Sequence, residues 1–173
     1  REDVLSMCEE YRPDFILNAA AYNQVDLAET ERAQAFEVNE QGPRNLAEAA
    51  AKINAKFVHV STDYVFDGKK SAPYTEADVP NPLSVYGASK YAGEKAVLET
   101  YSQSYVVRTA WVYHPAGENF LKKMYTLRDR PEIKIVDDQT GSPTYAPHLA
   151  EAILKLVETE AFGIYHLAGS GGV

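Results

Sequence analysis

The feature that most constrains the fold is the alternation of short apolar runs with longer helical stretches along the chain. The clearest apolar run is Lys56 to Thr62, which is short, rich in β-branched residues and bounded by polar ones, as is typical of a buried parallel strand. Strands that alternate with helices form parallel sheets with helices on both faces. The sequence therefore predicts an α/β fold with a Rossmann-like, doubly wound parallel sheet.

The remaining elements follow from the same patterns. Further strands are expected over residues 14–18, 105–109, 133–136 and 164–167, and helices over residues 3–11, 27–53 with a bend near Gly42-Pro43, 82–101, 118–127 and 146–158. Residues 67–81 are rich in Pro, Gly and Asp and are expected to form a loop.

Composition limits the kinds of partner. A chain of 173 residues that is 45% hydrophobic and 24% charged is long enough for one sizeable core. The net charge of −8 argues against nucleic acid or an anionic membrane as a general partner. No signal peptide or long apolar span is evident, and the single cysteine, Cys8, fits a reducing cytoplasm.

Thr62, Tyr86 and Lys90 form a candidate proton-transfer group. Thr62 ends a predicted strand, and open α/β sheets bind ligands at the carboxyl ends of their strands. Tyr86 and Lys90 lie one helical turn apart, so their side chains can address one point. A phenol has a pKa of about 10, which a neighbouring ammonium would lower. The group could therefore move a proton onto or off a carbonyl oxygen.

The Tyr-x-x-x-Lys spacing is weak evidence by itself, because Tyr91 and Lys95 repeat it on another face of the same predicted helix. Tyr86 is favoured because the small residues 87–89 (Gly-Ala-Ser) follow it and would let a flat cofactor approach the helix. Tyr91 is then expected to be a packing residue.

Seven motifs run through almost the whole chain. They are Asn-Ala-Ala-Ala-Tyr at 18–22, Val-Asn at 38–39, Gly-Pro-Arg-Asn-Leu at 42–46, Ser-Thr-Asp-Tyr-Val-Phe-Asp-Gly at 61–68, Asn-Pro-Leu-Ser-Val-Tyr-Gly-Ala-Ser-Lys at 81–90, Arg-Thr-Ala-Trp-Val-Tyr at 108–113 and Asp-Asp-Gln-x-Gly-Ser-Pro-Thr at 137–144. In these motifs and their order the chain resembles the dTDP-4-dehydrorhamnose reductases, a family of extended short-chain dehydrogenases/reductases. An ordered set of this length is far more specific than any one motif.

The resemblance implies a reaction. NADPH (or NADH) would reduce the C4 keto group of dTDP-4-dehydrorhamnose to give dTDP-L-rhamnose, a step in nucleotide-sugar and cell-surface polysaccharide biosynthesis. Tyr86 would protonate the emerging alkoxide while Thr62 donates a hydrogen bond to the same oxygen. Lys90 would also hold the nicotinamide ribose. The implied partners are a nucleotide-sugar substrate and a second copy of the chain in a homodimer, with no nucleic acid and no membrane.

The resemblance also implies the organisation of the chain. The family places its glycine-rich pyrophosphate loop upstream of Arg1, so we expect an interior piece of a longer subunit whose sheet is incomplete at both ends. Residues 1–113 would form the Rossmann-like cofactor and catalytic part, and residues 114–173 mixed substrate-binding elements with a returning strand. Residues 169–172 (Gly-Ser-Gly-Gly) are not expected to bind phosphate, because no helix follows them.

Further positions match sites of the family. The cofactor-binding candidates are Asn18, Ala19, Ala20, Ala21, Asn39 and Ser61, in addition to Tyr86 and Lys90. The substrate-binding candidates are Asn23, Val25, Asp63, Trp111 and Asn119. Trp111 would pack against the deoxysugar or serve as a plain core residue, and Asn39 would support a water relay to the lysine or bond the backbone near the helix bend. Asp63 would contact sugar or cap a turn.

Two basic residues, Lys122 and Lys123, follow Asn119 at the start of a predicted helix. A helix N-terminus with nearby lysines could receive the substrate diphosphate, or the lysines could form a solvated basic face. His59 lies inside an apolar strand and is expected to be a hydrogen-bonded buried histidine. The other histidines show no metal-ligand spacing, so we expect no catalytic metal.

Two other functions stay open. A regulatory protein of methionine adenosyltransferase resembles these reductases in fold, so the chain could be a non-catalytic nucleotide-binding subunit. Thr62 and the segment 108–113 favour the reductase instead. A sugar-nucleotide epimerase or dehydratase of the same superfamily would share Tyr86 and Lys90 but would be expected to differ around Trp111.

Overall fold

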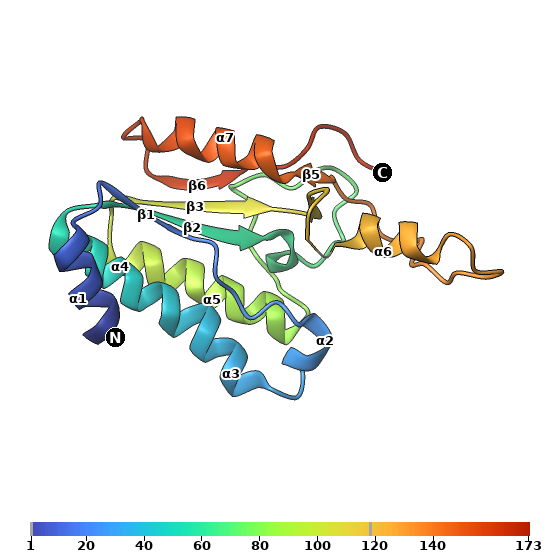
Figure 1. Cartoon of the computed structure of the whole chain (residues 1–173), viewed down its shortest axis with the longest axis horizontal. Coiled ribbons are helices and arrows are strands. Elements are labelled where there is room, and N and C mark those ends of the chain that lie inside the picture. Colours follow the sequence, from blue (N-terminus) through green and yellow to red (C-terminus); the bar gives the residue numbers. More distant parts are fainter. Residues whose placement is uncertain (1, 118) are drawn as a thin grey trace.

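A four-stranded parallel sheet forms the centre of the protein, as seen in a computed structural model that describes residues 2–117 and 119–173 (Figure 1). Its strands, in spatial order, are β1 (Phe15–Asn18), β2 (Lys56–Thr62), β3 (Ser104–Thr109) and β6 (Gly163–His166). The register pairs Asn18 with His59, Thr62 with Thr109, and Arg108 with His166. The predicted parallel α/β sheet is confirmed, and the carboxyl ends of its strands meet at one edge.

Helices cover both faces of the sheet (Figure 1). On one face lie α4 (Gly42–Ile53) and α5 (Val85–Thr100), with α1 (Glu2–Tyr11) packed against α4; on the other lies α7 (Ala146–Val157). Successive strand residues point to opposite faces. The core therefore forms two clusters of buried residues, Ala47, Ala50, Phe57, Val97 and Val106 beneath α4 and α5, and Val58, Tyr105, Val107, Ile153 and Val157 beneath α7.

The helical stretch predicted over residues 27–53 is divided. It contains α2 (Val25–Ala28), α3 (Arg32–Phe36) and a π-helical turn, η1 (Glu37–Gln41), which leads directly into α4. Pro43 has no N–H to offer the carbonyl oxygen of Asn39, four residues earlier. The regular hydrogen-bond ladder is interrupted there, which is a common setting for a π turn. The bend expected near Gly42-Pro43 thus occurs just before it.

The strand predicted over residues 133–136 is wrong. This segment has no regular structure, and Ile135 and Val136 are 55% and 65% exposed. A strand needs a hydrogen-bonded partner, and in the described part of the chain none lies beside these residues. The short strands here are instead β4 (Val112–Tyr113) and β5 (Thr144–Tyr145), which pair in parallel.

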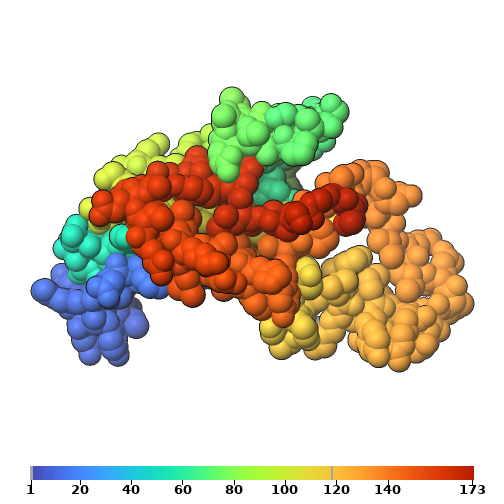
Figure 2. Space-filling model, turned by 90° about the horizontal axis from the view of Figure 1, so that it is seen from above, coloured from blue at the N-terminus to red at the C-terminus, as the bar shows by residue number. Residues whose placement is uncertain are grey.

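The segment around α6 (Phe120–Leu127) extends away from the sheet, at one end of the molecule (Figures 1 and 2). The helix expected here was to start at Glu118, which lies outside the described residues. Among the described residues, no helix combines the length and apolar character needed to cross a bilayer.

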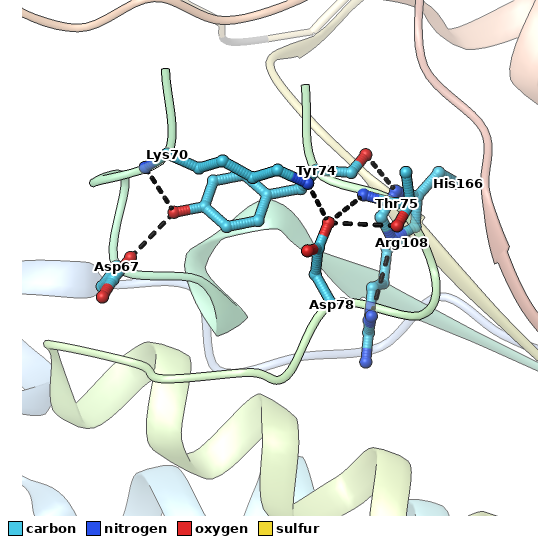
Figure 3. A network of polar contacts seen from close by, with 7 residues as sticks. All are labelled: Asp67, Lys70, Tyr74, Thr75, Asp78, Arg108 and His166. Atoms are coloured by element: carbon cyan, nitrogen blue, oxygen red, sulfur yellow. Dashed lines mark hydrogen bonds and ion pairs between the residues drawn. The ribbon is translucent and has the colours of Figure 1, made fainter. Parts of the chain in front are cut away.

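The predicted loop at residues 67–81 is held in place by its own polar side chains (Figure 3). The Tyr74 hydroxyl donates to Asp67 at 2.7 Å, and Lys70 Nζ donates to Asp78 at 2.6 Å. The carbonyl oxygen of Tyr74 also lies 3.3 Å from Nδ1 of His166, the last residue of β6. These contacts hold the loop against the carboxyl edge of the sheet.

Candidate active site

Thr62, Tyr86 and Lys90 lie together around the carboxyl end of β2. Thr62 is the last residue of β2, and its hydroxyl accepts the backbone N–H of Tyr64 at 3.2 Å, which starts the 3-10 turn η2 (Asp63–Val65). Tyr86 lies in the first turn of α5, where the Thr62 side chain is close enough to lower the pKa of its phenol by hydrogen bonding. Lys90 Nζ donates to the carbonyl oxygen of Val60 at 2.7 Å. The hydroxyls of Thr62 and Tyr86 and the ammonium of Lys90 therefore all lie near the carboxyl end of β2.

The pKa of Tyr86 differs from the sequence expectation. Burial of the side chain raises its pKa above the usual 10, the hydrogen bond with Thr62 opposes this rise, and the charge of Asp63 adds to it. We expected Lys90 to lower the pKa of Tyr86. In the structure the Lys90 ammonium instead donates a hydrogen bond to the Val60 carbonyl oxygen, so it is directed at that oxygen and not at Tyr86.

The pKa of Lys90 is also shifted from its usual value. Its side chain is only 2% exposed, and burial lowers the pKa of the ammonium to about 8, while the charge of Glu94 opposes the shift. A charged group held in a dry environment with a pKa near neutrality is a recognised mark of a functional site. The contact with Val60 uses one of the three N–H donors of an ammonium, so Lys90 has the capacity to bind a further acceptor.

Gly87 and Ser89, which follow Tyr86, make packing contacts. We expected Gly87 and Ser89 to be small so that a cofactor could approach. A Cβ at Gly87 would lie 2.2 Å from the carbonyl oxygen of Tyr64, so the glycine permits the close approach of η2. Ser89 is buried and accepts a hydrogen bond from Asn39 at 2.9 Å. Both residues therefore support the packing of α5.

Asn39 lies fully buried in the π turn. Its side chain accepts from the backbone N–H of Tyr22 at 2.8 Å and donates to the Tyr22 carbonyl at 3.0 Å as well as to Ser89. Its own carbonyl oxygen faces α5, where a Cβ on Gly93 would lie only 2.0 Å away. The side chain thus fixes the segment after β1, and the backbone that it bonds is that of Tyr22 and not that of the helix bend.

Asn18, the last residue of β1, is held by His59 of β2. Asn18 Nδ2 lies 3.1 Å from His59 Nδ1, and Asn18 Oδ1 accepts the backbone N–H of Ala20 at 3.1 Å. Nδ1 is then an acceptor and the imidazole proton sits on Nε2. Nε2 is buried and has no hydrogen-bond partner in the described part of the chain. The expectation of a fully hydrogen-bonded histidine is therefore correct for only one ring nitrogen.

Most of the other cofactor and substrate candidates lie near the ends of β1 and β2, whereas the side chain of Ser61 is directed into the core. Ala19, Ala20 and Asn23 are exposed beyond β1, and Ala21 and Val25 are half-buried there. Asp63 is half-buried next to Thr62, whose hydroxyl donates to it at 3.0 Å, and burial raises the pKa of its carboxyl. Ser61 does not reach this edge by its side chain, because its hydroxyl donates to Glu94 at 2.5 Å inside the core.

Sequence reasoning missed the buried ion pair between Glu94 of α5 and Arg108 of β3. Arg108 also stacks over the ring of Phe66, with its guanidinium carbon 5.1 Å from the ring centre, and its Nη1 lies 3.5 Å from His166. The sequence did contain a sign of the Glu94–Arg108 pair. Charged side chains are almost never fully buried unless they are paired, and Arg108 stands in an apolar strand.

Trp111 and Asn119 lie on the segment that leads to α6. Trp111 is 40% exposed, so it is not a plain core residue. Asn119 caps α6 by accepting the backbone N–H of Lys122 at 3.1 Å and donates to the His114 carbonyl at 2.6 Å. Next to it is a pocket of about 360 Å³ lined by Tyr113, His114, Pro115, Asn119, Leu121, Lys122 and Tyr125. The described residues contain no cluster of three or more potential metal ligands.

Comparison with known proteins identifies the family. The family model described as RmlD substrate binding domain matches residues 1–173. The chain belongs to this family. A dTDP-4-dehydrorhamnose reductase of Aggregatibacter actinomycetemcomitans is 43% identical over 176 residues, covering 98% of this chain and 60% of the relative. The resemblance inferred from the sequence motifs is thereby confirmed.

Solved structures of this family are also similar to the chain. The dTDP-4-dehydrorhamnose reductase of Bacillus anthracis, crystallised in complex with NADP, is 45% identical and superposes with a TM-score of 0.96, covering 99% of this chain and 61% of that one. The corresponding protein of Clostridium acetobutylicum is 40% identical with a TM-score of 0.94, covering 98% and 60%. A UDP-glucose 4-epimerase of Thermotoga maritima is 25% identical with a TM-score of 0.82, covering 99% and 60%. The chain thus spans about three fifths of the length of these relatives.

Proposed function

We propose that this chain is the catalytic part of an NADPH-dependent (or NADH-dependent) dTDP-4-dehydrorhamnose reductase. The observation that carries the proposal is the gathering of the Thr62 and Tyr86 side chains at the carboxyl end of β2, with the Lys90 ammonium bound to the same strand two residues earlier. Relatives named as this reductase match 98% and 99% of the chain at 43% and 45% identity. The reaction would reduce a ketone to an alcohol in nucleotide-sugar and polysaccharide biosynthesis.

The residues around the sheet edge fit a nicotinamide cofactor. The small, exposed side chains of Ala19 and Ala20 leave the end of β1 open, and the buried Lys90 offers N–H donors to hydroxyl groups. Asn18, Asn39 and Ser61 would shape this site through the backbone they fix, because their side chains are bonded within the protein. When bound, the cofactor would supply the hydride.

The proton would come from Tyr86. Reduction of a ketone places negative charge on its oxygen, and two hydroxyl donors on that oxygen stabilise the transition state. The Thr62 and Tyr86 side chains lie close together, so a single substrate oxygen placed beside them would be within reach of both. The raised pKa of Tyr86 keeps the phenol protonated before the reaction. Lys90 would then stabilise the phenolate that remains.

The nucleotide-sugar substrate would lie along the segment from the sheet edge to α6. Trp111 offers an exposed indole for the deoxysugar, with Asp63, Asn23 and Val25 nearer the strand ends. The pocket beside Asn119 would receive the nucleotide part, because it combines aromatic walls with Lys122. A stack of aromatic side chain and base contributes affinity with little conformational cost.

The setting of this reaction would be the cytoplasm. Cys8 has no second cysteine in this chain with which to pair, and burial raises the pKa of its thiol, which makes it less reactive. This is consistent with a reducing compartment. A homodimer, with no nucleic-acid or membrane partner, remains part of the proposal.

The test is Tyr86→Phe in a subunit that carries this chain at the full length of its relatives. Turnover should fall by orders of magnitude while NADPH affinity stays nearly constant, because only the proton donor is lost. Tyr91→Phe is the matched control and should be nearly silent, since Tyr91 packs beneath Lys95 instead, with 4.9 Å between Nζ and the ring centre. Comparable turnover in Tyr86→Phe and Tyr91→Phe would overturn the proposal.

The same assay separates the alternatives. A reductase consumes one NADPH for each ketone reduced, whereas an epimerase regenerates its cofactor and shows no net consumption. A non-catalytic nucleotide-binding subunit would bind NADPH without consuming it in the presence of dTDP-4-dehydrorhamnose. The epimerase alternative rests on the fold likeness to the Thermotoga maritima enzyme.

A further inference from the structure

Trp111 is held in an unusual backbone conformation. Its φ of +46° lies in the left-handed region, which a bulky residue rarely adopts. Its carbonyl oxygen accepts the backbone N–H of Thr144 at 3.2 Å, next to the point where β4 and β5 pair. The backbone of Trp111 is therefore fixed from one side by the segment 141–145. This contact defines where the indole starts but not where the ring points.

The indole of Trp111 lies close against Gly141. A Cβ built on Gly141 would lie 2.5, 2.6 and 3.0 Å from three consecutive atoms of the indole, Cε2, Cζ2 and Cδ2. Two of these atoms, Cε2 and Cδ2, are shared by the two rings of the indole, so the added carbon would lie against the ring system where the rings are fused. Any side chain at position 141 would occupy the space of the indole. Trp111 is still 40% exposed, so part of the residue is open to solvent.

Gly141 is anchored in turn by the C-terminal residues. The backbone N–H and carbonyl of Gly141 exchange hydrogen bonds with those of Val173, at 3.1 and 3.0 Å. The hydroxyl of Ser142 donates to the carbonyl of Gly171 at 2.7 Å, and the N–H of Gly169 donates to the hydroxyl of Thr144 at 3.1 Å. The glycine-rich tail thus backs the segment that carries Gly141, so this segment is not free to withdraw from the indole.

We propose that Gly141 is a positioning residue that fixes the orientation of Trp111 by lying against one side of its indole, leaving the other side to receive the sugar ring of the substrate. The geometric half of this inference stands on the contact alone. The half that concerns the sugar rests on the proposed function. The specificity of the sugar site would then depend on a residue that makes no contact with the sugar.

Fluorescence tests the geometric half, because Trp111 is the only tryptophan in the chain. Gly141→Ala should displace the indole into solvent, shift its emission to longer wavelength and raise its quenching by acrylamide. Gly42→Ala is the matched control, because it adds the same methyl group where the nearest atom would be 3.9 Å away. It should leave the emission unchanged. A spectrum of Gly141→Ala identical to that of the control would overturn the proposal.

Kinetics in the full-length subunit test the other half. Gly141→Ala should raise KM for dTDP-4-dehydrorhamnose by roughly threefold to tenfold, with NADPH affinity unchanged. In a Trp111→Ala background the same change should have no further effect, because the residue on which it acts is gone. An equal rise in KM with and without Trp111 would overturn the positioning role. If the emission shifts but neither variant changes KM, the positioning stands and the assignment of Trp111 to the sugar fails.

Discussion

The carboxylate of Glu94 binds the guanidinium of Arg108 with nitrogen–oxygen distances of 2.7, 3.0 and 3.2 Å, and the two side chains are only 1% and 3% exposed. Glu94 lies one helical turn after Lys90 on α5, while Arg108 lies on β3. Ser61 of β2 donates to the same carboxylate. The pair therefore ties the helix that carries the candidate catalytic residues to two strands of the sheet.

Replacing only one residue of this pair should destabilise the protein. Arg108→Met leaves the Glu94 carboxylate buried without its partner, and we expect a loss of about 3–5 kcal/mol in the free energy of unfolding. The double variant Arg108→Met/Glu94→Leu removes both charges and should be more stable than the single variant. Urea unfolding of the single and double variants measures this difference. Additive losses would show that the two side chains do not act as a pair.

A methyl group on Gly93 should also destabilise the protein. The new Cβ would lie 2.0 Å from the Asn39 carbonyl oxygen, so α5 and the π turn must move apart. We expect Gly93→Ala to lower the free energy of unfolding by about 2–4 kcal/mol, because neither backbone can yield easily. Thermal or urea unfolding measures the loss. Gly42→Ala, which adds its methyl group without a clash, should be neutral or slightly stabilising, and equal stabilities of the two variants would contradict the close contact.

Lys90 should make stability depend on pH in the alkaline range. Its pKa in the folded protein is about 8, below the 10.5 of a free lysine, so between these values the unfolded chain binds more protons and folding becomes more favourable as pH rises. The penalty of burying the charge is complete below pH 8 and disappears above 10.5. As the pH rises from 8 to 10.5, the free energy of unfolding should increase by about 3 kcal/mol relative to that of Lys90→Met. A difference that is constant with pH would mean that Lys90 titrates normally.

Trp111→Ala distinguishes a substrate contact from a packing role. If the indole packs on the deoxysugar, KM for dTDP-4-dehydrorhamnose should rise roughly tenfold in the full-length subunit, while titration with NADPH is unchanged. Since 40% of the side chain is exposed, the midpoint of thermal unfolding should fall only slightly. A large fall in this midpoint with an unaltered KM would favour the core role instead.

The sequence alone determined the order of strands and helices and the edge at which the site lies. Short β-branched runs such as Lys56 to Thr62 are local signals, and parallel strands bring their carboxyl ends to one edge whatever their details. Thr62 was therefore placed at this edge by its position at the end of a strand, and Tyr86 and Lys90 were placed near each other by their helical spacing. The motifs also indicated the family, because an ordered set of seven does not depend on any one contact.

Only the tertiary structure decided what the polar side chains contact. Lys90 binds Val60 and not Tyr86, Ser61 faces Glu94 inside the core, and Gly141 lies on Trp111 from 30 residues away. The predicted strand at residues 133–136 was wrong for the same reason, since a strand exists only where another segment pairs with it. Local patterns determine which residues are apolar, small or charged. Which of them meet is set by the packing of segments far apart in the chain, and that information is not contained in any one stretch of the sequence.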